Sequence, residues 1–271
     1  MTGRRVFTVS LGILLSTLAA STHAELSGDE LYDLLKQANE AFRQANALVA
    51  DPQAETFYKK AILSYERIIN EGRIRNAKLF YNLANAYLLT ENVGKAILNY
   101  RRAEQLDGAD ANIRKNLEFA RAQRIDKIAP RTEERVLETL FFWHYDLALH
   151  TRFVLSCVLF AAACISVTMM IWLGRSPPKT VVATIAGLLM LCFAVSVAVE
   201  SRRRVATVCG VITEAQVVAR QGDGQGYPQS FKDPLHAGTE FDLLERRPGW
   251  LHIKLADDSD GWIPDTAAEL I

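Results

Sequence analysis

Residues 77–110 read AKLFYNLANAYLLTENVGKAILNYRRAEQLDGAD, and this stretch decides the fold of the N-terminal half of the chain. Its apolar and small residues recur at the spacing of two amphipathic helices, and Asn92 and Gly94 suit the turn between them. Small side chains at Ala84 and Ala96 allow the two helices to cross closely. The space around this crossing is expected to be filled by Leu83, Tyr87, Tyr100 and Leu106. The stretch therefore predicts a helical hairpin.

The same stretch resembles a tetratricopeptide repeat in its length and residue pattern. One such repeat cannot bury its own apolar face, so further hairpins are expected within residues 25–130. Upstream, residues 38–42 and 61–65 resemble the two helices of a first repeat, separated by about eleven residues more than the consensus. Asp51-Pro52 suggests an extended or reshaped hairpin loop there. Downstream, residues 113–120 open a third unit whose second helix is not evident.

The inner face of these hairpins is predicted to bind a peptide or a partner helix. The residues expected on it are Asn39, Lys78, Tyr81, Asn82, Asn85 and Leu88. Asn39 and Asn82 match the two asparagine positions of repeats that clamp a C-terminal carboxylate. The basic positions of that clamp are instead Leu35, Asn112 and Asn116, so a carboxylate clamp is rejected. The alternative is that the polar residues merely solvate this face.

Two uncharged runs predict a membrane hairpin. Phe153–Leu173 has the length needed to cross about 30 Å of hydrocarbon, and Val181–Val199 is slightly shorter. Residues 174–180 contain two prolines and form a short loop, which makes the two helices antiparallel neighbours. Residues 131–152 are expected to form an amphipathic approach to the bilayer. Neither run carries a charged residue or histidine, which argues against transport; a buried soluble hairpin is the alternative.

Residues 1–24 resemble a secretory signal, with Arg4 and Arg5 before an apolar stretch and small residues at a cleavage site; an uncleaved anchor is the alternative. This signal predicts that both flanking domains lie outside the cytoplasm. The three arginines at 202–204 outnumber Arg175 and Lys179 in the loop and favour the opposite orientation. The first hydrophobic element usually sets the orientation, so we expect the exported one.

Residues 205–271 are predicted to form a small all-β domain, because short alternating stretches are separated by glycine-rich turns. Leu235–Thr239, Gly249–Trp250 and Gly261–Trp262 follow one another as in the bacterial SH3 family, and the resemblance implies an SH3-like barrel. Trp250 and Trp262 are candidate ligand contacts, with a place in the core as the alternative. The loop at 221–226 is too irregular to bind phosphate.

Composition excludes several classes of function. The formal net charge is zero, so nothing indicates a nucleic-acid partner. Three of the four cysteines lie in the apolar runs, and Cys209 has no second thiol in a soluble segment. Histidines and cysteines lack metal-ligand spacing, so no cofactor or metal is expected. Without a nucleophile–base pair or paired carboxylates, the chain is not expected to be an enzyme.

The full order of signal, helical repeats, apolar hairpin and SH3-like barrel resembles the Bat aerotolerance family, specifically its BatE-like component. Residues 116–121 and Phe142-Trp143 fit this resemblance too. It implies a Gram-negative inner-membrane protein with periplasmic domains that works with von Willebrand A-domain Bat proteins and a MoxR-type ATPase under oxidative or envelope stress.

Two functions remain open from the sequence. The first is a scaffold or adaptor that binds protein partners through its repeat and SH3-like domains. The second is an envelope sensor whose SH3-like domain binds peptidoglycan.

Overall fold

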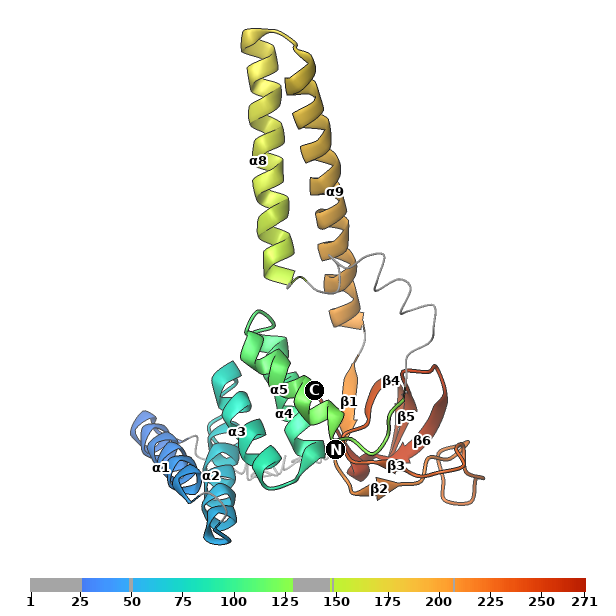
Figure 1. The fold of residues 1–271 in the computed structure, drawn as a ribbon. Helices are drawn as coiled ribbons and strands as arrows, with labels where there is room; N and C mark the ends of the chain where they lie inside the picture. The colour runs from blue at the N-terminus through green and yellow to red at the C-terminus, as the bar shows by residue number, and fades with distance from the viewer. Residues whose placement is uncertain (1–25, 49–50, 129–146, 148, 207) are drawn as a thin grey trace, which may run out of the picture.

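The computed structural model describes residues 26–48, 51–128, 147, 149–206 and 208–271, with only the backbone described at 203–206. Within these ranges it contains seven α-helices and a C-terminal set of antiparallel strands (Figure 1). The predicted combination of helices, two long apolar helices and a C-terminal sheet is therefore what the structure shows. The signal segment 1–24 and most of the predicted approach at 131–152 lie outside the described residues.

The N-terminal helices form a helical domain from α1 (Gly28–Ala47), α2 (Gln53–Asn70), α3 (Ala77–Leu89), α4 (Val93–Leu106) and α5 (Ala111–Ala122). Polar side chains cap the starts of four of these five helices, and α2, which follows Pro52, is the exception. Ser27 and Glu30 form a reciprocal capping box before α1, and Asn76, Asn92 and Asp110 accept backbone N–H groups before α3, α4 and α5. These caps satisfy N–H groups that have no partner within the helix.

The helices pack as the hairpins α1–α2 and α3–α4, with α5 against α4. Ala84 and Ala96 are completely buried, as expected for small residues at a helix crossing, and Ala38 and Ala61 occupy the same role in the first hairpin. The predicted fillers Leu83, Tyr87 and Tyr100 are buried as well. Leu106 is different: it is the last residue of α4 and is 46% exposed, so its predicted place in the core is wrong.

The extra residues of the first hairpin lie mainly in its helices. Helices α1 and α2 have 20 and 18 residues, against 13 and 14 in α3 and α4. The connection runs only from Leu48 to Pro52. Of the two predicted forms of this connection, the extended loop is therefore wrong, because longer helices take up the extra residues. A longer α1 extends the inner face of the domain.

Helices α8 (Leu149–Leu173) and α9 (Pro177–Ala206) form an apolar hairpin that projects away from the rest of the chain (Figure 1). Both are long and apolar enough to cross a membrane, and most of their apolar side chains face outward. Both helices extend beyond the predicted runs: α8 starts four residues before Phe153, and α9 continues seven residues past Val199. Near the base, Arg152 on α8 is buried and donates to Ser196 Oγ on α9 at 2.7 Å.

The C-terminal residues form a β-domain around a five-stranded antiparallel sheet in the order β6-β5-β4-β1-β7. The strands are β1 (Cys209–Ile212), β4 (Glu240–Arg247), β5 (Trp250–Lys254), β6 (Asp260–Pro264) and β7 (Ala268–Leu270). The short strands β2 (Gln216–Val217) and β3 (Leu235–His236) pair separately, and the 3-10 turn Asp265–Ala267 precedes β7. Alternate residues such as Leu251, Ile253 and Ile263 form its core.

Both outer strands of the sheet are partly covered by other parts of the chain. On β6, the backbone N–H and C=O of Trp262 exchange hydrogen bonds with Arg220 at 2.7 and 2.8 Å. On β7, the carbonyl of Leu270 accepts a hydrogen bond of 2.9 Å from Arg102 of α4.

The β-domain packs directly on α4 of the helical domain. Val211 of β1 is completely buried and belongs to the apolar core of the helical domain. Gly94 lies so close to the β-domain that a Cβ added there would be 2.8 Å from the Ile212 carbonyl oxygen and 3.1 Å from Ala237 Cβ. The two domains thus share a tightly packed boundary.

Candidate partner-binding face

The predicted groove residues lie on α1 and α3. Lys78 is exposed at the start of α3, and Asn39 is exposed on α1. Tyr81, Asn82 and Asn85 are half-buried along α3. Leu88 is also half-buried, but it packs against the core of the helical domain and serves mainly as a packing residue. We call Asn39, Lys78, Tyr81, Asn82 and Asn85, together with Asn116 of α5, the polar face.

A buried tyrosine connects the first two helices of this face. The hydroxyl of Tyr65 on α2 donates to Asn39 Oδ1 on α1 at 2.7 Å, and it also hydrogen-bonds the side chain of Asn82 on α3. Burial raises the pKa of Tyr65 to about 12, with the Asn82 hydrogen bond opposing the shift. The hydroxyl therefore stays protonated at neutral pH and can hold both amides in place.

The second hairpin repeats this arrangement. The hydroxyl of Tyr100 on α4 donates to Asn85 Oδ1 on α3 at 2.5 Å. Asn116 on α5 donates to the same Asn85 oxygen at 3.1 Å and to the Tyr81 hydroxyl at 2.9 Å. Burial raises the pKa of Tyr100 as well. Tyr65 and Tyr100 thus play the same part in successive hairpins: each fixes an asparagine of the first helix.

Sequence reasoning placed the asparagines on this face but missed the tyrosines as their partners. Tyr100 was expected only to fill space in the core. Asn116 was considered for this face only because it occupies a position that is basic in repeats that clamp a carboxylate. The available signal was the spacing: Tyr65 and Tyr100 lie 35 residues apart, and Asn82 and Asn116 lie 34 apart. This spacing aligns the tyrosines of the two hairpins, whereas their acceptors Asn39 and Asn85 lie 46 residues apart and do not follow the repeat length.

A hollow of about 330 Å³ lies on the α1 part of the face. Asn39 lines it, so one residue joins the hollow to the Tyr65 hydrogen bond. The other described lining residues combine apolar, amide and charged groups: Tyr32, Leu35, Lys36, Glu40 and Arg43. Tyr32 is 69% exposed, which leaves a large aromatic surface open to a partner.

The groups on this face can form hydrogen bonds and ion pairs. Amide and hydroxyl groups donate and accept hydrogen bonds, and Lys78 adds a positive charge. Over the ranges that the structure describes, no group of three or more histidine, cysteine, aspartate or glutamate residues could hold a metal ion.

The two candidate tryptophans of the β-domain have different environments. Trp262 is only 7% exposed. His252 stacks on it with ring centroids 4.6 Å apart, and the Arg247 guanidinium carbon lies 4.6 Å from the ring centroid. Its indole is thus occupied by side chains of the same domain. Trp250 is half-buried at the start of β5 and is the more accessible of the two.

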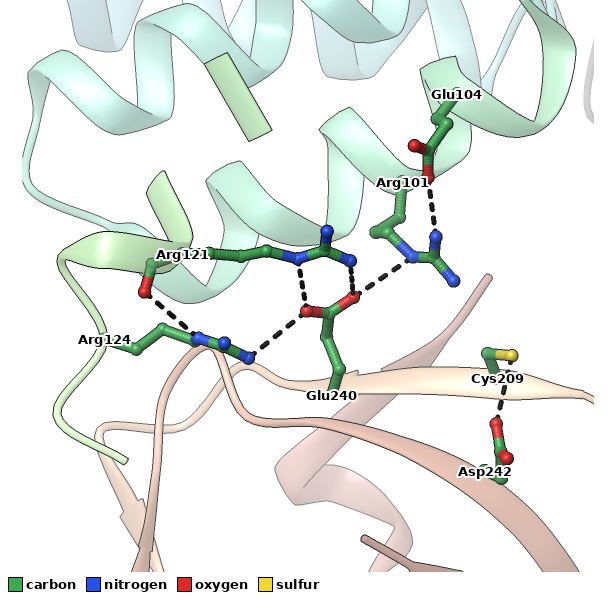
Figure 2. Close-up of polar contacts among 7 residues, drawn as sticks. All are labelled: Arg101, Glu104, Arg121, Arg124, Cys209, Glu240 and Asp242. Carbon is green, nitrogen blue, oxygen red and sulfur yellow. Dashed lines mark hydrogen bonds and ion pairs between the residues drawn. The ribbon is translucent and has the colours of Figure 1, made fainter. Parts of the chain in front are cut away.

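Cys209 starts β1 and donates from its thiol to Asp242 Oδ1 at 3.3 Å (Figure 2). The other three cysteines lie in α8 and α9. The thiol is therefore held against a carboxylate on the adjacent strand.

A scan against protein-family models finds no model that matches this chain, and a search of curated proteins finds no significant match.

Proposed function

We propose that this chain is a membrane-anchored adaptor and not an enzyme. In this proposal the hairpins α1–α2 and α3–α4 are tetratricopeptide repeats whose polar face binds a polypeptide segment of a protein partner. The β-domain is an SH3-like barrel, and α8 and α9 are the anchor in the lipid bilayer. The proposal assigns binding to the helical domain because its polar groups gather on one face.

The observation that carries the proposal is the repeated tyrosine–asparagine hydrogen bond. Tyr65 and Tyr100 hold Asn39 and Asn85 in fixed orientations on equivalent helices. Side chains fixed in this way lose little conformational entropy when a partner binds, which favours affinity. A polypeptide offers both N–H donors and C=O acceptors, so it complements a face composed of amides and hydroxyls.

Photo-crosslinking from the polar face tests this function in native membranes. A photoreactive amino acid at Asn85 or Tyr81 is expected to capture one specific protein, identified by mass spectrometry. The matched control is the same amino acid at Leu63, which is 63% exposed on α2 and lies outside the polar face. The adaptor proposal fails when Asn85 and Tyr81 capture no specific protein, or when Leu63 captures the same protein equally well.

We further propose the location and the partners that the family resemblance implies. The anchor would lie in the bacterial inner membrane, with the helical domain and β-domain in the periplasm. The partners would be von Willebrand A-domain Bat proteins associated with a MoxR-type ATPase. Alkaline phosphatase fused after Ile271 is expected to be active in this orientation. An inactive phosphatase fusion, with a fluorescent protein at the same position folded and bright, would reverse the orientation.

The envelope-sensor alternative needs an aromatic ring that can stack on a sugar. The covered state of Trp262 disfavours it, because both His252 and Arg247 would have to move first. Sedimentation of the full chain with isolated peptidoglycan separates the two functions. Retention that is lost on Trp250→Ala would favour the sensor over the adaptor.

A further inference from the structure

The boundary between the helical domain and the β-domain contains a charge cluster centred on one carboxylate. Glu240, at the start of β4, forms a bidentate pair with Arg121 of α5, with both N···O distances at 2.7 Å (Figure 2). Arg101 Nε of α4 and Arg124 Nη1, just after α5, each lie 3.2 Å from a Glu240 oxygen. The Glu240 side chain is only 21% exposed. We call these four residues the Glu240 cluster.

Further polar contacts cross the same boundary on either side of the cluster. Asp126, which follows α5, accepts hydrogen bonds from the His236 backbone N–H and the Thr239 hydroxyl, each at 2.6 Å. It also contacts His236 Nδ1 at 2.8 Å. On the other side, Arg102 of α4 lies 3.1 Å from Glu269 Oε2 of β7. Charged groups that are partly buried and paired in this way fix the relative orientation of two surfaces.

The two domains are connected to the apolar hairpin by chain segments of very different length. Helix α9 ends at Ala206 and β1 starts at Cys209, so the β-domain directly follows the hairpin (Figure 1). On the other side, α5 ends at Ala122 and α8 starts only at Leu149. The β-domain is therefore closely tied to α9, and the helical domain is connected through a much longer segment.

The docked β-domain leaves the polar face uncovered. Its contacts use α4, Arg121 of α5 and residues within 124–128, whereas Asn39, Tyr81 and Asn85 lie on α1 and α3. A partner can thus reach the polar face while the two domains are in contact. Docking does not block binding at this face.

We propose that the β-domain serves as an intramolecular mount for the helical domain. Through the Glu240 cluster it docks on the helical domain of its own chain, and this contact holds the polar face at a fixed position above the bilayer. The membrane part of this inference rests on the proposed function. The docking part does not, because it depends only on contacts within the chain. The chemistry that selects the partner is one carboxylate facing three guanidinium groups.

The His236 backbone amide reports docking directly, because it donates to Asp126 of the other domain. The Trp262 amide on the outer strand β6 donates to the Arg220 carbonyl within the β-domain at 2.7 Å and reports whether that domain is folded. Hydrogen exchange would be measured at single-residue resolution on the full chain in lipid nanodiscs. Glu240→Arg puts a fourth cation among three arginines, so the His236 amide should exchange at least about tenfold faster while the Trp262 amide keeps its protection.

The matched control is Glu214→Arg, which makes the same charge change at an exposed residue between β1 and β2. It should leave the His236 exchange rate unchanged. Combining Glu240→Arg with Arg121→Glu in one chain recreates an oppositely charged pair and should restore protection. The recovery should be partial, because Arg101 and Arg124 still repel the cation at position 240. Unchanged His236 exchange in Glu240→Arg, or equal acceleration in Glu214→Arg, would overturn the docking proposal.

Mixing two variants distinguishes docking within one chain from docking between copies. Chains with Glu240→Arg and chains with Arg121→Glu each keep one intact surface. When the two variants are reconstituted together, the His236 amide should remain as unprotected as it is in each variant alone. Recovery of protection on mixing would overturn docking within one chain.

Energy transfer from a fluorophore at position 78 to acceptor lipids then tests the mount. Glu240→Arg should broaden the distribution of distances between position 78 and the bilayer, and an unchanged distribution would refute the mount.

Discussion

Replacing Gly94 by alanine adds one methyl group at the point where α4 meets the β-domain. That Cβ would be 2.8 Å from the Ile212 carbonyl oxygen, 3.1 Å from Ala237 Cβ and 3.2 Å from the Gly238 nitrogen. Two of these three atoms are backbone, so they cannot move aside as a flexible side chain would. The methyl group therefore forces the two domains apart or shifts the backbone of one of them.

Two opposing effects determine the sign of the change in stability. Alanine is preferred to glycine inside a helix by up to about 1 kcal/mol, and by less near the first turn, where Gly94 lies. Extra methylene-sized groups in a well-packed region cost about 1–3 kcal/mol. In the docked arrangement the packing cost dominates, and we expect Gly94→Ala to lower the free energy of unfolding by about 1–2 kcal/mol.

Urea unfolding of the full chain in nanodiscs, followed by helical circular dichroism, measures this change. With a slope of about 2 kcal/mol per molar urea, the midpoint should fall by about 0.5–1 M. Gly28→Ala is the control, because Gly28 also lies in the first turn of a helix and an added Cβ there has no atom within 4 Å. Its midpoint should stay the same or rise slightly. A rise of the Gly94→Ala midpoint that matches the control would refute the close packing of the two domains.

Three further outcomes are expected. Tyr100→Phe removes the hydrogen bond from the Tyr100 hydroxyl to Asn85 of α3. In the same urea assay it should lower the free energy of unfolding by about 1 kcal/mol, whereas an unchanged midpoint would contradict that bond. Although burial alone would raise it, the arginines Arg121, Arg101 and Arg124 hold the pKa of Glu240 below its ordinary value. Because the folded-state pKa is depressed, the ionised carboxylate stabilises docking above the unfolded value of about 4.3, and this contribution is lost as the pH falls below it. The protection factor of the His236 amide, which compares its exchange rate with the intrinsic rate at the same pH, should therefore stay high from about pH 7 to 5 and fall below about pH 4. Arg247→Gln should uncover Trp262 and increase acrylamide quenching of its fluorescence, and Arg246→Gln, on an exposed neighbour, should not.

The local sequence pattern was sufficient to predict the elements of the helical domain. The small side chains of Ala84 and Ala96 allow two helices to cross closely, and the apolar residues around them occur at helical spacing. Of the two alternatives for Asp51-Pro52, the extended loop was wrong, because residues added as whole helical turns preserve the apolar face and leave no break in the pattern. Longer helices in α1 and α2 accommodate them instead.

The docking of the two domains could not be predicted in the same way. Glu240 and Arg121 are 119 positions apart, and each looks like an ordinary solvated charge in its own segment. A pairing over that distance depends on the whole fold and leaves no periodic signal. The polar face was intermediate: its asparagines were found from the repeat pattern, but the hydrogen bonds from Tyr65 and Tyr100 become visible only when the helices are packed.

The covered outer strands of the sheet limit how the β-domain can contact other proteins. An exposed sheet edge can take up an additional strand from another chain, either as a ligand or as a step toward aggregation. Here Arg220 occupies backbone groups of Trp262 on β6, and Arg102 occupies the Leu270 carbonyl on β7. Strand addition would have to displace these bonds first. Contacts of the β-domain with other proteins should therefore depend mainly on side chains, and copies of this chain should not readily join into sheet-to-sheet polymers.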